Sequence, residues 1–259
     1  MTDFVRYEYA DGAARVTLAD GDAGNPLHPE SGRQLFEAVL RAKADRARVI
    51  VLAAEGRFFS VGGDLGSFGR AGDDELEPML LELAEAAHRT IVELVRGDAI
   101  VVSAVQGTAA GIGFPLAAAA DVVLAADTAK FSLAYTKVGL SPDGGGSMLV
   151  HTLGLHRVLR LALLGDLLTA AEAHAAGLVA RVVPADELAA ATDEVVANLL
   201  AGSGQALAAT KRLVRDVAEP APETALRKEA ASISRLGGSP DGREGIAAFL
   251  EKRAPKFGS

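Results

Sequence analysis

Two glycine-rich turns, about fifty residues apart, constrain this chain more than any other feature. The first lies at residues 58–65 (FFSVGGDL) and the second at residues 105–114 (VQGTAAGIGF). Each follows an apolar run and is expected to open into a helix. Main-chain N–H groups at such a junction lack a partner inside the helix and carry partial positive charge. Brought together, the two turns would offer paired donors to an oxygen that becomes negative, which is an oxyanion hole.

Short apolar strands alternate with helical patterns along most of the chain. Residues 5–9 and 14–18 are expected to form a hairpin through Asp11-Gly12, which is a strong turn signal. Alternating strands and helices predict an α/β fold. Further strands are expected at residues 49–53, 100–105, 122–125 and 179–183, and helices at residues 31–45, 155–164, 170–176 and 186–200.

The clearest boundary is Gly202-Ser203-Gly204. Residues 1–201 are interpreted as the α/β body that holds the site, and residues 202–259 as a helical region. Its helices are expected at residues 205–217, 222–235 and 240–253, the last with Ser239 as cap and Pro240 at its first position. A helical tail of about 55 residues is too small to bury a good core alone. It should pack on the body or on another subunit.

Composition excludes several classes of function. The net charge of −8 argues against nucleic acid as a partner. The absence of cysteine removes disulfides, thiolate catalysis and cysteine-ligated metals. The five histidines show no metal spacing, so no metal is expected, and His88 is interpreted as a packed or surface residue. No basic segment followed by an apolar one marks the N-terminus, so a cytoplasmic location is expected.

One uncharged stretch, residues 99–120, is long enough to suggest a membrane span. Gln106, Thr108, Pro115 and three glycines interrupt it, and much of its apolar content is alanine. It is better interpreted as a buried strand, a glycine turn and a buried helix. No membrane partner is therefore expected.

Six blocks in order resemble the crotonase superfamily, also called the enoyl-CoA hydratase/isomerase family. The two glycine turns resemble the oxyanion turns of that family, and nearly the whole chain is covered. The resemblance implies a crotonase-like spiral of ββα units and a C-terminal helical oligomerisation region that builds trimers or hexamers and covers coenzyme A. It also implies an acyl-CoA substrate and no separate cofactor. The other four blocks are residues 121–125, 131–145, 164–179 and 245–253.

The resemblance implies a specific oxyanion hole. The thioester oxygen would lie between the main-chain N–H groups of Gly63 and Ile112. Asp64 is interpreted as a helix cap or a brace of its turn. Lys252, Arg253, Lys256 and Phe257 form a basic tail that ends in an aromatic residue. This tail has two open interpretations, which are contact with coenzyme A and a solvated helix end with favourably placed cations. The residues expected to contact substrate are Ser60, Val61, Gly62, Asp64, Leu65, Gly111, Tyr135, Lys252 and Phe257.

The position of the carboxylates decides between reactions. Hydratases of the family use two glutamates, at positions that match Pro115 and Tyr135 here. Proline cannot ionise, and tyrosine is a poor base near neutral pH because its ordinary pKa is about 10. Weak or no standard hydratase activity is expected.

One acid remains at the expected active site, Asp143 in the sequence SPDGGG. Isomerases of the family carry an aspartate at this position, and one carboxylate can take a proton from one carbon and return it to another. An aspartate between proline and glycine is also a common turn residue. The sequence therefore predicts a double-bond isomerase with Asp143 as the proton shuttle. The alternatives are a hydratase-type or other crotonase reaction, using Tyr135 or an acid not yet placed, and a silent acyl-CoA binder.

Overall fold

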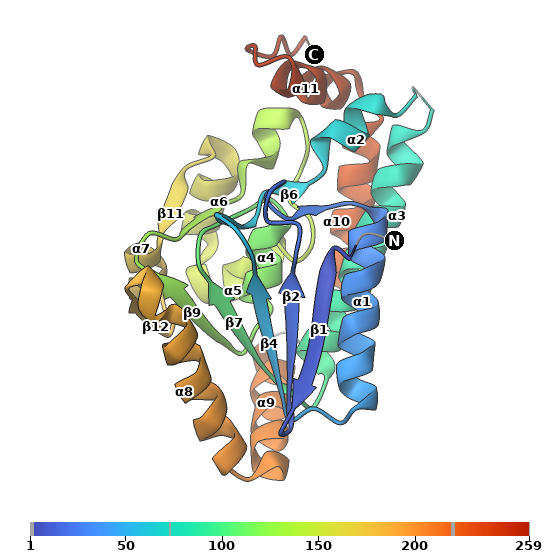
Figure 1. Cartoon of the computed structure of the whole chain (residues 1–259). Coiled ribbons are helices and arrows are strands. Elements are labelled where there is room, and N and C mark those ends of the chain that lie inside the picture. The colour runs from blue at the N-terminus through green and yellow to red at the C-terminus, as the bar shows by residue number, and fades with distance from the viewer. Residues whose placement is uncertain (1–2, 73, 219–220, 259) are drawn as a thin grey trace.

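The computed structural model describes residues 3–72, 74–218 and 221–258 of the chain. Its largest sheet has six strands in the order β1-β2-β4-β7-β9-β12 (Figure 1). The hairpin expected through Asp11-Gly12 is confirmed as an antiparallel β1–β2 pair, and the other neighbours in the sheet are parallel. The strands are β1 (Val5–Ala10), β2 (Ala13–Leu18), β4 (Val49–Ala54), β7 (Ile100–Val105), β9 (Val122–Ala126) and β12 (Arg181–Val183).

Three strands of this sheet, β4, β7 and β9, are each followed by a short strand of a second sheet. The second sheet has the order β11-β10-β8-β5, and each strand pair leads into a helix or helical turn. This repeat confirms the predicted α/β spiral of ββα units. The short strands are β5 (Phe58–Ser60), β8 (Thr108–Ala110), β10 (Lys130–Ser132) and β11 (Leu167–Thr169), and β3 (Pro26–Leu27) pairs separately with β6 (Gly62–Gly63).

Helices cover the sheets on several sides. α1 (Pro29–Ala44) packs on α3 (Leu76–Arg96), which in turn packs on α10 (Pro222–Gly237), as Figure 1 shows beside β1. The remaining helical segments are α2 (Leu65–Arg70), α4 (Gly113–Ala118), α5 (Val150–Leu153), α6 (Leu155–Leu164), α7 (Ala170–Ala175), α8 (Leu188–Ala201), α9 (Gly204–Ala218), α11 (Pro240–Leu250) and the 3₁₀ turns η1 (Ala134–Val138), η2 (Ser147–Leu149) and η3 (Ala185–Glu187).

The C-terminal helices pack on the body rather than apart from it. α11 lies over α2 and η1, at the end of the molecule opposite α9 (Figure 1). At the other end, the buried Lys211 of α9 forms an ion pair with Asp121 and donates hydrogen bonds to the carbonyl oxygens of Leu94 and Ala99. These contacts hold the helical region against the ends of α3, α4 and β7.

The uncharged stretch at residues 99–120 is confirmed as strand, turn and helix, because it forms β7, β8 and α4. All six residues of β7 are buried in the central sheet. Within the described residues, the helices are too short or too polar to cross a bilayer.

Candidate active site

The two glycine turns lie against each other because β5 and β8 are parallel neighbours. Gly62 and Gly111 both have positive φ, +97° and +53°, which a residue with a side chain rarely adopts. A Cβ atom on Gly62 would lie 3.0 Å from the carbonyl oxygen of Ala110 and 3.3 Å from the Cα of Gly111. Glycine is thus required both by the backbone conformation and by the close approach of the turns.

Side chains of the first turn hold its backbone rather than reaching outward. Ser60 is fully buried; its hydroxyl donates to the carbonyl oxygen of Asn25 at 2.8 Å and accepts the Gly62 N–H at 3.1 Å. Asp64 caps α2, where it accepts hydrogen bonds from the N–H and hydroxyl of Ser67. Burial opposes ionisation of Asp64, but these hydrogen bonds hold its pKa below the usual value. The interpretation of Asp64 as a helix cap is confirmed.

The second turn ends at Ile112, the residue before α4. The Ile112 N–H has no hydrogen-bond acceptor within the part of the chain that the structure describes. Its φ of −63° places this amide at the start of the helix, where the first N–H groups lack intrahelical partners. It is therefore available to a ligand oxygen.

A cavity of about 330 Å³ opens beside both turns. Its wall includes Gly63, Ile112 and Asp143, so the two predicted donors and the predicted acid reach the same space. The polar side chains on its wall are Tyr135, Lys137 and Asp143, and Asp143 is the single carboxylate there among the described residues. The rest of the wall is apolar or glycine and includes Val61, Leu65, Phe68, Leu80, Leu83, Gly111, Val138, Leu140, Ile233 and Phe249.

Asp143 lies directly beside the second turn. The residue is 4% exposed and belongs to the segment between η1 and η2. Gly144, which follows it, has a φ of +67°, and a Cβ atom there would lie 2.4 Å from Cγ1 of Ile112. Only glycine allows this segment to approach Ile112 so closely.

His88 of α3 holds the Asp143 carboxylate from behind. Its Nε2 lies 2.7 Å from Oδ1 of Asp143, and the Gly144 N–H points to the same nitrogen at 3.3 Å. Both side chains are nearly enclosed. Burial alone would lower the pKa of His88, but Asp143, with Glu229 and Glu85, outweighs burial and raises it. The interpretation of His88 as a packed residue is correct, but its contact with Asp143 was not foreseen.

Tyr135 is buried beside the same carboxylate. Its hydroxyl donates to the main-chain oxygen of Asp143 at 3.1 Å. Burial and the negative charges of Asp143 and Glu229 raise the pKa of Tyr135 well above its ordinary value. Tyr135 is therefore a neutral donor that braces the Asp143 segment, and its high pKa argues against the role of base.

Glu229 of α10 is the charged residue that sequence reasoning missed. Its carboxylate accepts the N–H groups of Gly145 at 2.7 Å and Ser147 at 2.8 Å. Burial raises the pKa of Glu229 above its usual value. Its position among the buried residues Leu226, Ala230 and Ile233 at helical spacing is the signal that could have found it.

His88, Asp143 and Glu229 place ligand-type atoms within 4.8 Å of one another. His88 and Asp143 are hydrogen-bonded to each other, and both oxygens of Glu229 accept amide N–H groups. Nε2 of His88, Oδ1 of Asp143 and both oxygens of Glu229 are thus already used within the protein, and Oδ2 of Asp143 is the one carboxylate oxygen left for a ligand among the described atoms of this cluster. The cluster is a hydrogen-bond network rather than a metal site.

The tail residues do not reach this cavity. Lys252 and Phe257 are exposed beyond the end of α11, and neither lies on the cavity wall. Phe249 of α11 lines it instead. Pro115 is buried in α4, outside the same wall.

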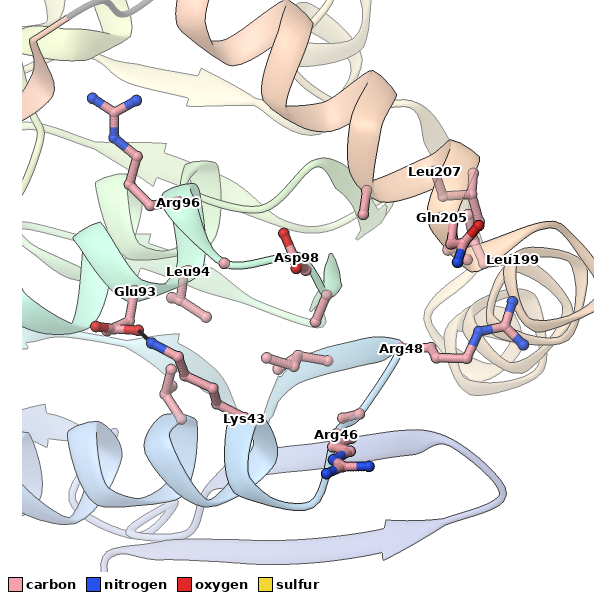
Figure 2. A pocket seen from close by; sticks show the side chains of 17 residues that line it. Lys43, Arg46, Arg48, Glu93, Leu94, Arg96, Asp98, Leu199, Gln205 and Leu207 are labelled. Carbon is pink, nitrogen blue, oxygen red and sulfur yellow. Dashed lines mark hydrogen bonds and ion pairs between the residues drawn. The ribbon is translucent and has the colours of Figure 1, made fainter.

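A larger cavity, of about 620 Å³, lies where the ends of α1 and α3 face the corner between α8 and α9 (Figure 2). Its charged side chains other than Arg46 have protein partners among the described residues. Lys43 pairs with Glu93 at 2.8 Å, and Arg48 donates to the carbonyl oxygens of Leu200 and Gly202 at the helix corner. Neither glycine turn nor Asp143 lines this cavity. It is not the candidate active site.

Comparison with known proteins identifies the family. A family model described as enoyl-CoA hydratase/isomerase matches residues 8–259. A probable enoyl-CoA hydratase of Rhodobacter capsulatus is 39% identical over 255 residues, which cover 98% of this chain and 97% of that protein. The 1,2-epoxyphenylacetyl-CoA isomerase of Escherichia coli is 33% identical over 265 residues, or 99% of each chain.

The fold agrees with this result. The crystal structure of an enoyl-CoA hydratase from Mycobacterium avium subsp. paratuberculosis superimposes with a TM-score of 0.90 over 100% of both chains, at 35% identity. The family acts on acyl-CoA thioesters, and its named relatives include both hydratases and isomerases. From its sequence match, fold and paired glycine turns, the chain belongs to the crotonase, or enoyl-CoA hydratase/isomerase, family.

Proposed function

We propose that the protein is an enoyl-CoA isomerase that moves a double bond through an oxyanion-stabilised dienolate. The thioester oxygen accepts hydrogen bonds from the N–H groups of Gly63 and Ile112. The Asp143 carboxylate removes a proton from the α-carbon of a 3-enoyl thioester, and negative charge spreads onto the thioester oxygen. The proton then returns from Asp143 to the γ-carbon, which leaves the 2-enoyl product. No atom is gained or lost overall.

The observation that carries this proposal is the shared wall of one cavity. Gly63, Ile112 and Asp143 all line it, and no second carboxylate does so among the described residues. A reaction that moves one proton needs one acid–base group. Hydration also needs a water activated on the double bond, and the family positions that supply glutamates for it match Pro115 and Tyr135 here. The high pKa of Tyr135 argues against its use as a base.

The remaining substrate contacts are also proposals. Val61, Leu65 and Gly111 line the cavity around the thioester, together with apolar side chains that suit an acyl chain. Lys252 and Phe257 lie outside the cavity wall, so their proposed contact is with the far end of coenzyme A. We also propose a homotrimer or hexamer, as is usual for the family.

Hydration remains the second candidate because the relative from Rhodobacter capsulatus is named as a probable hydratase. Glu229 is the buried acid that such a reaction would need to recruit. Its two oxygens are occupied by the amides of Gly145 and Ser147, and it does not line the cavity. These contacts favour isomerisation.

Asp143→Asn tests the proposal directly. The variant keeps the size of the side chain but cannot shuttle the proton, so kcat for conversion of 3-enoyl-CoA to 2-enoyl-CoA should fall by about 10²–10⁴-fold. Absorbance of the conjugated thioester follows the reaction, and calorimetric titration with a saturated acyl-CoA checks that binding survives. Hydration of 2-enoyl-CoA at an unchanged rate in Asp143→Asn would contradict the proposal. Binding without turnover on any enoyl-CoA would identify a silent homologue.

A further inference from the structure

We propose that His88 is a positioning residue for Asp143, holding one carboxylate oxygen so that the other faces the substrate. This inference rests on the proposed role of Asp143 as the proton shuttle. It adds a second residue to the acid–base group, from a helix that contributes no polar group to the cavity wall. The acid–base group of the reaction is then the His88–Asp143 pair.

His88 reaches the substrate only through Asp143. It lies on α3, is 5% exposed, and is not part of the cavity wall, whereas Asp143 is. Leu80, Leu83 and Ala84 of the same helix form apolar parts of that wall. His88 therefore lies behind the carboxylate, as seen from the cavity.

The two oxygens of Asp143 have different surroundings. Oδ1 lies 2.7 Å from Nε2 of His88, a short contact typical of a charge-assisted hydrogen bond. Oδ2 has no hydrogen-bond partner in the described part of the chain, and it is not among the polar atoms enclosed without a partner. Oδ2 is therefore the oxygen left open to the cavity and to the substrate proton.

The two neighbours of Nε2, Oδ1 of Asp143 and the Gly144 N–H, suit different protonation states of this nitrogen. If Nε2 carries the proton, it donates to the Oδ1 carboxylate, and Oδ2 is ready to act as a base. If Nε2 is bare, it accepts the Gly144 N–H at 3.3 Å, and the 2.7 Å contact then needs the proton on Oδ1. When Oδ2 takes the substrate proton, Oδ1 can still accept from a protonated Nε2, so the same contact serves the basic and the acidic form of Asp143 without movement of the backbone.

Other contacts of this segment leave the carboxylate to His88. Tyr135 donates to the main-chain oxygen of Asp143, and Glu229 accepts the amides of Gly145 and Ser147. The charged groups that act on His88 are Asp143, Glu229 and, on its own helix, Glu85, all of them acidic. They raise the pKa of His88, so a cationic imidazole forms as pH falls through a value above 6.5. The cationic imidazole attracts the Asp143 carboxylate and so competes with the substrate proton for its negative charge.

The test compares His88→Gln with His88→Leu. Glutamine can place a donor near the position of Nε2 but does not titrate, whereas leucine removes the donor and keeps an apolar packing group. We expect kcat to fall by about 10–100-fold in His88→Leu, the effect of losing one hydrogen bond to a charged group. His88→Gln should recover most of that loss. KM should stay within about twofold in both variants, because His88 does not line the cavity.

The pH profile gives a readout that a structural role alone would not move. In the wild type, kcat should decline on the acid side as His88 becomes cationic. In His88→Gln this decline should shift to lower pH because no imidazole titrates. An unchanged profile in His88→Gln would overturn the inference even if His88→Leu fails to fold. The inference would also be overturned if both variants lost kcat/KM entirely through a rise in KM, with kcat unchanged.

Two further measurements separate this inference from the proposed function. If Asp143→Asn retains isomerisation, the proposed function fails whatever His88 does. If Asp143→Asn is inactive while both His88 variants match the wild type, only the role of His88 fails. An NMR titration of the His88 ring needs no turnover, and its pKa should fall in Asp143→Asn, which removes the carboxylate charge. An unaltered pKa would show that the contact is not made.

Discussion

Two of the cavities of this protein differ in how their polar groups are used. The cavity in Figure 2 is about 620 Å³, and most of its charged side chains are held by ion pairs or hydrogen bonds near the surface, as Lys43 is by Glu93. The cavity beside Asp143 is about 330 Å³, but the unpaired main-chain N–H of Ile112 and one buried carboxylate converge on it. Volume alone would favour the first. The second cavity is identified as the site because polar groups with unused hydrogen-bonding capacity converge within its apolar wall.

The ion pairs of the two regions show the same difference. The side chains of Lys43 and Glu93 are 66% and 29% exposed, whereas those of His88 and Asp143 are 6% and 5% exposed. An exposed pair contributes about 0–1 kcal/mol because water screens it. Removing one partner of a buried pair leaves an unsatisfied polar group in a low-dielectric site, which is far more costly. Substitutions should therefore have large effects at the Asp143 cavity and small effects at the cavity of Figure 2.

After Asp143→Asn, the largest of these effects is expected at the oxyanion hole, from Ile112→Pro. Proline removes the N–H that is proposed to bind the thioester oxygen, and the φ of −63° at this position already suits a proline ring. Loss of one oxyanion donor should lower kcat by about 10²–10³-fold. Steady-state kinetics on 3-enoyl-CoA measure the loss.

Ile112→Ala is the matched control for this change. Both variants lose the isoleucine side chain that packs on Gly144, but alanine keeps the N–H. Thermal melting of both proteins separates lost packing from lost catalysis. Equal kcat values in the two variants would show that the Ile112 amide does not stabilise the transition state.

An intermediate effect, on stability, is expected from Glu229→Gln. Glutamine can accept only one of the two amides of Gly145 and Ser147, and its NH₂ group must face the other. The free energy of unfolding should fall by about 1–3 kcal/mol, the cost of an unsatisfied buried group. Urea unfolding, followed by circular dichroism, measures this difference.

The pH dependence of that difference has a definite sign. Burial raises the folded-state pKa of Glu229 above the unfolded value of 4.5. Its contribution to stability is therefore full below pH 4.5 and is lost as pH rises through the folded pKa. Glutamine does not titrate, so the cost of Glu229→Gln should be larger at pH 5 than at pH 8. A larger cost at pH 8 would mean that Glu229 is stabilised as the ion.

Local features of this molecule could be predicted from sequence, because their causes are local. The Asp11-Gly12 turn has positive φ at both residues, as its sequence indicates, and Ser239 caps α11. The glycine turns were predictable because their backbone needs a positive φ, which few other residues allow. Their contact follows from the pairing of β5 with β8, which the family resemblance implies but neither turn determines alone.

The network around Asp143 could not be predicted, because its partners come from distant helices. His88 is 55 residues from Asp143, and Glu229 is 84 residues from Gly145. The face that α3 or α10 turns to this segment depends on how the helices pack on each other. The tail differs from the helix expected over residues 240–253 for a local reason. α11 ends at Leu250, and Lys252 adopts a left-handed conformation instead of continuing the helix.

The smallest effect is expected at the cavity of Figure 2, from Lys43→Ala combined with Arg46→Ala. Both side chains are exposed, and the Lys43–Glu93 pair is largely solvated. The free energy of unfolding should change by less than about 1 kcal/mol, and kcat/KM should stay within about twofold of the wild type. Acyl-CoA titration and steady-state kinetics on the double variant check both values. If affinity for acyl-CoA fell tenfold or more, the larger cavity would have to be part of the substrate site, because no contact of these two residues reaches the Asp143 cavity.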